Sequence, residues 1–304
     1  MSRVTVEQVA YAGWRNCYRL TNGAIELIAV ADIGPRVIRC GFIGGQNLFY
    51  ECKDQLGNHG EPWWMIRGGH RFWIAPETVP ETYALDNDPV EASVQGHDSL
   101  VLVQPVEHET GLRKEIIITM HEDGCIQLAH RITNAGKVAV RWAPWPATLL
   151  APGGVAFASF PERATHEQNL LPTNPFVMWA YTDLSDKRWT FTKKWVVLRQ
   201  DSSIDGAQKM GLFNERTFAA YLLNGELFVK RCRAHRNLPY ADYNSSLEIF
   251  TNPDFMELET LGPLTELAPG KSVSHAEEWW LHRPVEIGSD TDPELDRVFA
   301  PFMQ

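Results

Sequence analysis

Short apolar runs separated by turn residues recur along almost the whole chain. Arg113 to Met120 reads RKEIIITM, and Asp123-Gly124 then supplies a turn into a second run from Cys125 to Thr133. This order predicts a β-hairpin, and Asn224-Gly225 predicts a second hairpin with a two-residue turn. The alternation has the period of two that is typical of strands, whereas amphipathic helices repeat every 3.6 residues.

The predicted strands fall into two sets. The first set covers residues 24–31, 36–42, 99–103, 113–120, 125–133 and 138–145, and the second covers 194–199, 210–213, 217–223, 226–232, 246–250, 255–260 and 272–282. The pattern favours one short helix, Pro293 to Phe299, after the capping-type residue Asp292. The predicted fold class is therefore all-β, a large antiparallel β-sandwich with very little helix.

Two stretches, residues 52–87 and 160–193, are long and lack a regular pattern. Loops of this length in a compact domain usually form lids or the walls of binding sites. Both stretches are rich in aromatic residues that need packing partners, which argues against flexible linkers. Residues 1–304 are therefore expected to form a single domain.

Composition narrows the possible partners. The 304 residues are 44% hydrophobic and 22% charged, which is typical of a globular protein, and the formal net charge is -10. A nucleic-acid partner is not expected, because phosphate binding needs clustered Lys and Arg. There is no signal-peptide pattern at the start and no apolar run near the ~20 residues that span a bilayer. We expect a cytoplasmic protein without a membrane partner, as a monomer or homodimer.

The sequence predicts neither a metal nor another cofactor. The five cysteines are widely spaced, with no CxxC pair, and are expected to be reduced and mostly buried: Cys17, Cys40, Cys52, Cys125 and Cys232. Carboxylates such as Asp86, Asp88 and Glu248 show no recognisable Ca²⁺ or Zn²⁺ ligand spacing.

Several motifs, taken in order, resemble the aldose 1-epimerase (galactose mutarotase) superfamily. NGAIELIAVADIGPRVIRCGFIGGQNLFYE near the start is similar to its first strands, with Gly34-Pro35-Arg36 at the turn. FMELETLGPLTELAPGKSVSHAEEWWL is similar to its last strands, with Leu258-Glu259-Thr260 and the Pro269-Gly270 turn. The segment from Arg67 to Trp73, with IAPE, LFVK and YADYNSSLEIFTN, resembles a mutarotase-like subgroup known as a domain of unknown function.

The resemblance implies a galactose mutarotase-like sandwich and specific site residues. It implies that Glu259 is the catalytic base, because the superfamily carries its base in the Leu-Glu-Thr element. It also implies that His70 lies near the superfamily's first active-site histidine. The second histidine of true mutarotases, which serves as the general acid, has no counterpart here: residues 140–147 read VRWAPWPA.

Interconversion of sugar anomers needs one group to take the proton of the C1 hydroxyl and another to protonate the ring oxygen. A carboxylate and a histidine suit these tasks, so Glu259 is predicted as base and His70 as acid or orienting donor. The alternative for His70 is a hydrogen-bonded structural residue after a tight Gly68-Gly69 turn; under the functional interpretation these glycines let a ligand approach the backbone.

Alternation also places Glu257 and Glu259 on one face of a strand, with Leu258 facing the core. If the two carboxylates lie close together, the pKa of one is raised, which would supply an acid and a base without the missing histidine. The alternative is that this face is exposed to solvent and both glutamates are surface charges.

Further residues are candidates for substrate binding. Arg71 could hold sugar hydroxyls or a carboxylate, or form a salt bridge with Glu77 or Glu81. Trp73 and Trp145 are preferred for an aromatic wall, although most tryptophans of a sandwich belong to its core. The predicted substrate-binding set is Arg71, Trp73, Glu77, Trp145, Lys209, Lys230 and Glu257.

The two lysines of this set, Lys209 and Lys230, lie on predicted strands. If they point inward they need an anionic partner, which favours an acidic or phosphorylated sugar; surface lysines with packed stems are the alternative. The leading hypothesis is an isomerase, an aldose 1-epimerase-like sugar mutarotase acting on a small carbohydrate. The alternatives are a non-catalytic carbohydrate-binding or sensing protein, and a lyase or hydrolase acting on an acidic sugar.

Overall fold

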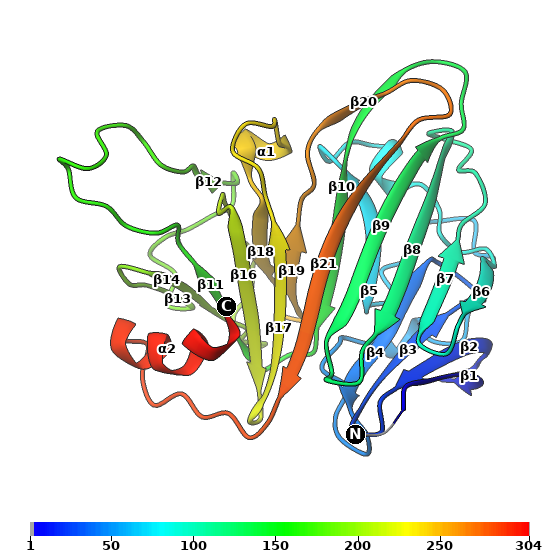
Figure 1. Ribbon diagram of the computed structural model, residues 1–304, viewed down its shortest axis with the longest axis horizontal. Helices are drawn as coiled ribbons and strands as arrows, with labels where there is room; N and C mark the ends of the chain where they lie inside the picture. Colours follow the sequence, from blue (N-terminus) through cyan, green and yellow to red (C-terminus); the bar gives the residue numbers. More distant parts are fainter. Residues whose placement is uncertain (1–2, 304) are drawn as a thin grey trace.

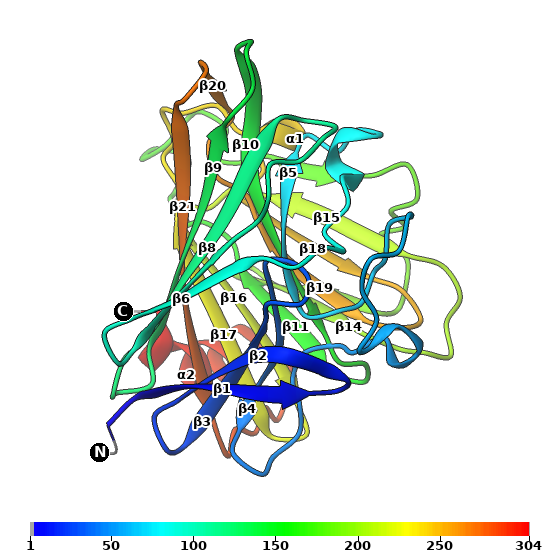
Figure 2. The ribbon, with the colours of Figure 1, turned by 90° about the vertical axis from the view of Figure 1, so that its right-hand side faces the viewer.

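Two antiparallel sheets form the body of the structure, a computed structural model that describes residues 3–303. Figure 1 shows one sheet in front of the other, and Figure 2 shows the two layers from the side. The prediction of an all-β sandwich with very little helix is confirmed. Residues 1, 2 and 304, which the predicted domain includes, lie outside the described residues.

The first sheet has the strand order β1-β2-β3-β4-β5-β10-β19-β18-β15-β12, and β20 pairs with β10 outside that order. Its strands are Thr5–Tyr11 (β1), Trp14–Thr21 (β2), Ile25–Val30 (β3), Arg36–Phe42 (β4), His70–Ala75 (β5), Val140–Leu150 (β10), Met256–Thr260 (β19), Leu247–Thr251 (β18), Gln208–Leu212 (β15), Phe176–Met178 (β12) and Thr265–Leu267 (β20).

The second sheet has the order β13-β14-β11-β16-β17-β21-β9-β8-β7-β6. Its strands are Trp189–Phe191 (β13), Trp195–Arg199 (β14), Val155–Ser159 (β11), Arg216–Leu223 (β16), Glu226–Arg233 (β17), Ser272–His282 (β21), Ile126–Asn134 (β9), Leu112–Met120 (β8), Ser99–Val103 (β7) and Glu91–Gln95 (β6). The predicted hairpin turn links β16 to β17, where Asn224 (φ 50°) and Gly225 (φ 78°) both adopt the left-handed conformation that such a turn requires.

Helix is confined to short segments. These are Ala241–Asn244 (α1), Asp292–Phe299 (α2) and the 3₁₀ turns Lys53–Gln55 (η1), Glu81–Tyr83 (η2) and Ala300–Phe302 (η3). The predicted helix is confirmed as α2, but its N-cap is Thr291 rather than Asp292. The Asp292 carboxylate instead accepts hydrogen bonds from the backbone N–H groups of Lys193 and Lys194. None of the helices in residues 3–303 combines the length and apolar character needed to cross a membrane.

The main core lies between the sheets, where alternate residues of facing strands are buried. On β8, Ile116, Ile118 and Met120 are buried, while Ile117 and Thr119 between them are only partly buried. Leu258 on β19 belongs to the same core cluster from the opposite sheet. Burial of each such side chain stabilises the fold by about 1.5–3 kcal/mol, so the two sheets are held face to face. The opposite face of β19 is left free for polar residues.

Some strands were not predicted. β5 lies inside the stretch from residue 52 to 87 that was expected to be irregular, and β10 extends to Leu150 through Pro144 and Pro146. The sequence of β5, HRFWIA, mixes charged and aromatic residues, so it shows no apolar alternation although it pairs with β4 and β10. The other unpredicted strands are β1, β2, β6, β11, β12, β13 and β20.

Candidate functional site

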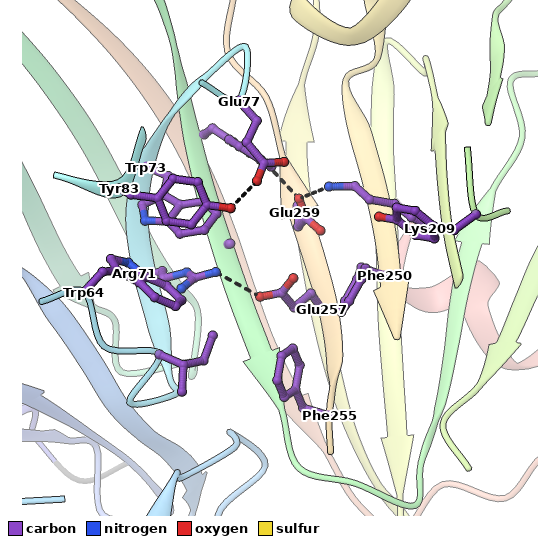
Figure 3. Close-up of a pocket in the computed structure, with 14 residues that line it drawn as sticks. Trp64, Arg71, Trp73, Glu77, Tyr83, Lys209, Phe250, Phe255, Glu257 and Glu259 are labelled. Carbon is purple, nitrogen blue, oxygen red and sulfur yellow. Dashed lines mark hydrogen bonds and ion pairs between the residues drawn. The ribbon is translucent and has the colours of Figure 1, made fainter. Parts of the chain in front are cut away.

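A pocket of about 260 Å³ lies on the face of the first sheet that is turned away from the second sheet (Figure 3). Strands β5, β10, β15, β18 and β19 supply its floor, and the two long irregular stretches supply its walls. It is lined by Trp64, Ile66, Arg71, Trp73, Glu77, Tyr83, Trp145, Ala147, Tyr181, Lys209, Phe250, Phe255, Glu257 and Glu259.

One row of cross-strand pairs organises the floor. Arg71 on β5 pairs with Ala147 on β10, and Ala147 pairs in turn with Glu259 on β19. Glu248 on β18 continues the row beyond Glu259. Paired residues share a face of the sheet, with Cβ atoms ~5 Å apart. Because Ala147 is the shortest member, the row leaves space between the guanidinium of Arg71 and the carboxylate of Glu259.

Glu259 is buried and held at one of its two carboxylate oxygens. Its Oε2 accepts hydrogen bonds from Lys209 Nζ and Trp145 Nε1, both at 2.9 Å. Its Oε1 is buried and has no hydrogen-bond partner within residues 3–303. A buried carboxylate oxygen without a donor is costly, so a ligand hydroxyl that donates to Oε1 would be stabilised there.

Lys209 joins two carboxylates on neighbouring strands. Its Nζ lies 2.8 Å from Glu248 Oε2 and 2.9 Å from Glu259 Oε2. Burial alone would lower the pKa of Lys209, but the two carboxylate charges outweigh it and hold that pKa well above its usual value. Burial is also the main reason that the pKa of Glu248 lies well above its ordinary value. Lys209 therefore remains a cation that fixes Glu259 and is unsuited to accept a proton.

Glu257 lies two residues before Glu259 on the same face of β19, as the alternation predicts. Its Oε1 is 3.3 Å from Arg71 Nη2 (Figure 3). Burial, and next the charge of Glu259, raise the pKa of Glu257 to about 7, although Arg71 opposes the shift. The two carboxylates thus differ in environment, since Glu259 has the full charge of Lys209 at 2.9 Å.

Arg71 is buried against two indole rings. Its Cζ lies 3.6 Å from the ring centroid of Trp73 and 5.2 Å from that of Trp64. The Nε and Nη1 atoms of Arg71 have no hydrogen-bond partner in the described part of the chain. They leave two unused donors beside the pocket, suited to accepting oxygens of a ligand. The salt bridge of Arg71 is to Glu257, not to Glu77 or Glu81 as one interpretation of the sequence held.

The outer part of the pocket comes from the loops. Glu77 accepts a hydrogen bond from the hydroxyl of Tyr83, and burial, with this bond, raises the pKa of Tyr83 to about 12. Tyr181 reaches the pocket from the second long stretch. These aromatic side chains continue the wall formed by Trp73 and Trp145, whose ring centroids lie 5.4 Å apart.

His70 lies on the other side of the sheet from the pocket. Its neighbours along β5, Arg71 and Trp73, line the pocket, so the alternation of the strand turns His70 into the space between the sheets. There His70 Nδ1 is 2.8 Å from Thr148 Oγ1, and its Nε2 is 2.7 Å from His130 Nε2 on the second sheet. The structure does not bring His70 and Glu259 together, and the hydrogen-bonded structural interpretation describes its position.

The hydrogen bonds of this interior cluster can all be made by two neutral imidazoles. His130 Nδ1 is 3.3 Å from the carbonyl oxygen of His275, so this nitrogen donates and Nε2 accepts from His70. His70 Nδ1 then accepts from the hydroxyl of Thr148. Burial agrees, because it lowers the pKa of His70 well below its usual value and that of His130 to about 3. Neither imidazole is a proton donor of the required strength at neutral pH.

The glycines before His70 serve the packing of the chain. A Cβ on Gly68 would lie 2.1 Å from the carbonyl oxygen of Tyr50, and a Cβ on Gly69 would lie 2.3 Å from that of Val37. Both glycines have positive φ angles, 101° and 71°. The turn is therefore glycine-rich because backbone approaches it, not because a ligand does.

Lys230 also lies between the sheets and does not line the pocket. Its Nζ is 3.0 Å from Glu277 Oε1 and 3.1 Å from the carbonyl oxygen of Leu258. The anionic partner expected for an inward lysine is thus supplied by the protein. His70, His130 and Glu277 form the one group of metal-ligand type found in residues 3–303, with ligand atoms within 4.8 Å. Lys230 already neutralises Glu277, so a divalent ion would leave excess buried positive charge.

The sequence predicted several pocket residues and missed others. The predicted residues that line the pocket are Arg71, Trp73, Glu77, Trp145, Lys209, Glu257 and Glu259. The lining residues that the sequence did not predict are Trp64, Ile66, Tyr83, Ala147, Tyr181, Phe250 and Phe255. The alternation around Glu248 and Phe250 could have indicated that these two side chains lie on one face of their strand. The loop residues carry no periodic signal.

Comparison with known proteins establishes the class of fold. No family model and no curated protein matches the sequence. A galactose mutarotase-like protein from Lactobacillus casei is similar over 88% of this chain and 100% of its own, with a TM-score of 0.58 and 11% identity. The chain therefore has the galactose mutarotase-like fold, as the resemblance of its motifs predicted.

Two further solved structures agree. A galactose mutarotase-like protein from Clostridium acetobutylicum is similar over 92% of this chain and 99% of its own, with a TM-score of 0.55 and 10% identity. A galactose mutarotase related enzyme from Lactobacillus acidophilus is similar over 89% of this chain and 98% of its own, with a TM-score of 0.55 and 9% identity.

Proposed function

We propose that this protein binds a small sugar in the pocket and interconverts its anomers, with Glu259 as general base and Glu257 as general acid. The observation that carries the proposal is the pair of buried carboxylates on one face of β19, one fixed by Lys209 and the other with a pKa of about 7. A carboxyl group whose pKa is raised toward neutral pH is suited to the role of general acid. The galactose mutarotase-like fold supports a carbohydrate as the ligand.

The reaction follows from the free oxygen of Glu259. Oε1 takes the proton of the C1 hydroxyl while protonated Glu257 gives its proton to the ring oxygen, so the bond between C1 and the ring oxygen breaks and an open-chain aldehyde forms. Rotation about the C1–C2 bond and reversal of the proton transfers close the ring as the other anomer. General acid-base assistance of this kind contributes ~10²–10⁴ in rate.

Glu257 takes the role that a second histidine has in true mutarotases. Among the residues that line the pocket in the described chain, none is a histidine. A carboxyl group with a pKa of about 7 is protonated in about half of the molecules at neutral pH, which suits a general acid. Arg71, through Nε and Nη1, would hold acceptor oxygens of the sugar, and Trp73 and Trp145 would contact the C–H side of its ring.

A non-catalytic sugar-binding protein is the second candidate. The observation that favours it is the fixed pairing of four pocket charges within the protein, Arg71 with Glu257 and Lys209 with Glu259. A pocket preformed in this way can bind a ligand without a reaction. The two candidates differ in turnover, not in occupancy of the pocket.

Polarimetry of freshly dissolved α-anomers tests the proposal. A panel of neutral aldoses, amino sugars, sugar phosphates and uronates would be followed with and without the protein. We expect faster equilibration of at least one sugar, in proportion to protein concentration. Saturable binding without acceleration of any sugar would favour the binding protein, and the absence of both would contradict a carbohydrate site.

A further inference from the structure

Carboxylates outnumber cations around the pocket. Three of its lining residues are acidic, Glu77, Glu257 and Glu259, and two are basic, Arg71 and Lys209. Glu248 stands directly behind Lys209 and adds a further carboxyl group. Burial raises the pKa of Glu248 and Glu257, so these two groups carry less than their full negative charge at neutral pH. Glu77 is the acidic lining residue that has no ion-pair partner among residues 3–303, and it leaves an uncompensated negative charge at the pocket.

Each of the two cations already has a carboxylate partner within the protein. Arg71 pairs with Glu257 at 3.3 Å, and Lys209 lies between Glu248 and Glu259. A carboxylate or phosphate on a sugar would find no cation free of a carboxylate partner and would be repelled by Glu77 and Glu259. The anionic partner that an inward Lys209 needs is present without any ligand.

Glu77 provides an acidic group at the pocket that the proposed proton transfers do not use. It is exposed and accepts the hydroxyl hydrogen bond of Tyr83. The charges of Glu259 and Glu77 both help to raise the pKa of Glu257. Further negative charge in the pocket is therefore disfavoured. Tyr83 and Tyr181 are aromatic lining residues from the loops, as Glu77 is, and aromatic faces attract cations.

We propose that the sugar bound in this pocket carries a protonated amine, held near Glu77 and the surrounding aromatic wall, and that sugars with a carboxylate or phosphate are excluded. The inference rests on the proposed carbohydrate function and specifies its substrate class as an amino sugar. The ammonium donates hydrogen bonds to carboxylate oxygens, while the sugar hydroxyls meet the unused oxygen of Glu259 and the unused donors of Arg71.

The test is binding measured by tryptophan fluorescence, which four indoles in or beside the pocket make possible: Trp64, Trp73, Trp145 and Trp179. The probes are glucosamine, glucose, N-acetylglucosamine, glucuronate and glucose 6-phosphate at about pH 6.5. An amine next to a substituted carbon titrates near pH 8, like an α-amino group, so glucosamine is mainly a cation at the lower pH. A repeat at about pH 9 removes that charge.

We expect glucosamine to bind about tenfold more tightly than glucose at pH 6.5 and about equally at pH 9, as one additional ion pair near a protein surface allows. Glu77→Gln should reduce the tenfold ratio several-fold, while Glu266→Gln on the exposed part of β20 should leave it unchanged. Glucuronate and glucose 6-phosphate should bind more weakly than glucose.

Two results would overturn the inference: glucosamine binding no better than glucose at pH 6.5, or an anionic sugar binding best. Failure of the proposed function gives a different result: polarimetry shows no acceleration of anomer exchange, even for a sugar that binds selectively. Selective binding of glucosamine without turnover would uphold the substrate class and contradict the epimerase. If none of the five sugars binds, both proposals fail.

Discussion

Glu259 and Arg71 stand in one row of the first sheet, separated only by Ala147. The carboxylate keeps one oxygen free and the guanidinium keeps two nitrogens free, and both side chains are buried. A small residue between an unused acceptor and unused donors leaves a place for a ligand that offers both kinds of group. Polyhydroxylated molecules have this property, as the proposed sugar ligand does.

The gap between these two residues is open to a direct test. Ala147→Leu would extend a side chain into the floor of the pocket, so we expect sugar binding to weaken by at least about tenfold (~1.4 kcal/mol). The new side chain occupies pocket space rather than the core, so the free energy of unfolding should change by less than about 1.5 kcal/mol. Fluorescence titration and urea denaturation measure the two effects, and unchanged binding would show that the ligand lies elsewhere.

The raised pKa of Glu257 predicts the pH dependence of stability. In the unfolded chain a glutamate titrates near 4.3, but in the folded protein the pKa is about 7. In the folded state Glu257 therefore keeps its proton up to a higher pH than in the unfolded state. The stability that Glu257 contributes at low pH is lost as the pH rises from ~4 through about 7. Between pH 5 and pH 8, urea denaturation should show a loss of stability that is about 2–3 kcal/mol larger in wild type than in Glu257→Gln, which keeps the loss that comes from Glu248.

The same group sets a limit on activity. As proposed general acid, Glu257 must be protonated, so epimerisation should decline as the pH rises above about 7. Glu257→Gln should reduce kcat/KM by ~10²-fold and remove this alkaline limb. A wild-type pH profile in the variant would assign the general acid to another group.

Lys209 is expected to stabilise the folded protein as well as to hold Glu259 in place. Lys209→Met would leave Glu248 and Glu259 buried without a counter-charge, which should cost about 3–5 kcal/mol. Glu248→Gln keeps the ion pair between Lys209 and Glu259, so its cost should be smaller, under about 2 kcal/mol. Thermal unfolding of both variants compares the two effects, and equal losses would contradict the arrangement.

His70 should behave as a structural residue. His70→Ala would leave His130 and Thr148 without their partner between the sheets, at a cost of about 2–4 kcal/mol. Below its unfolding temperature the variant should retain kcat/KM within a few-fold of wild type, because His70 does not line the pocket. A loss of ~10²-fold or more in a folded variant would restore His70 to the proton-transfer machinery.

The sequence was informative wherever one face of a strand is apolar. Alternation located β8, β9 and β19 and placed Glu257 and Glu259 on one face. It was uninformative for β5, because both faces of that strand carry polar groups: His70 toward an interior polar cluster and Arg71 toward the pocket. Periodicity gives two faces of a strand but does not identify which one meets a ligand, so His70 was assigned to the wrong side.

The pocket walls could not be predicted for a different reason. Trp64, Tyr83 and Tyr181 come from loops whose positions depend on contacts distant in the sequence. One such contact is the buried ion pair of Arg36 with Asp86, in which Arg36 also donates to the carbonyl of Gly68. Sequence patterns indicate that such loops need packing partners but do not indicate which ones.

The proposed role of Glu259 is tested by the rate of exchange between sugar anomers, followed by exchange NMR on the sugar that the panel identifies. The comparison is among wild type, Glu259→Gln and the exposed control Glu266→Gln at equal concentrations of folded protein. We expect a loss of ~10²–10⁴-fold for Glu259→Gln and wild-type exchange for Glu266→Gln. Wild-type exchange in folded Glu259→Gln would contradict the role of Glu259 as the base.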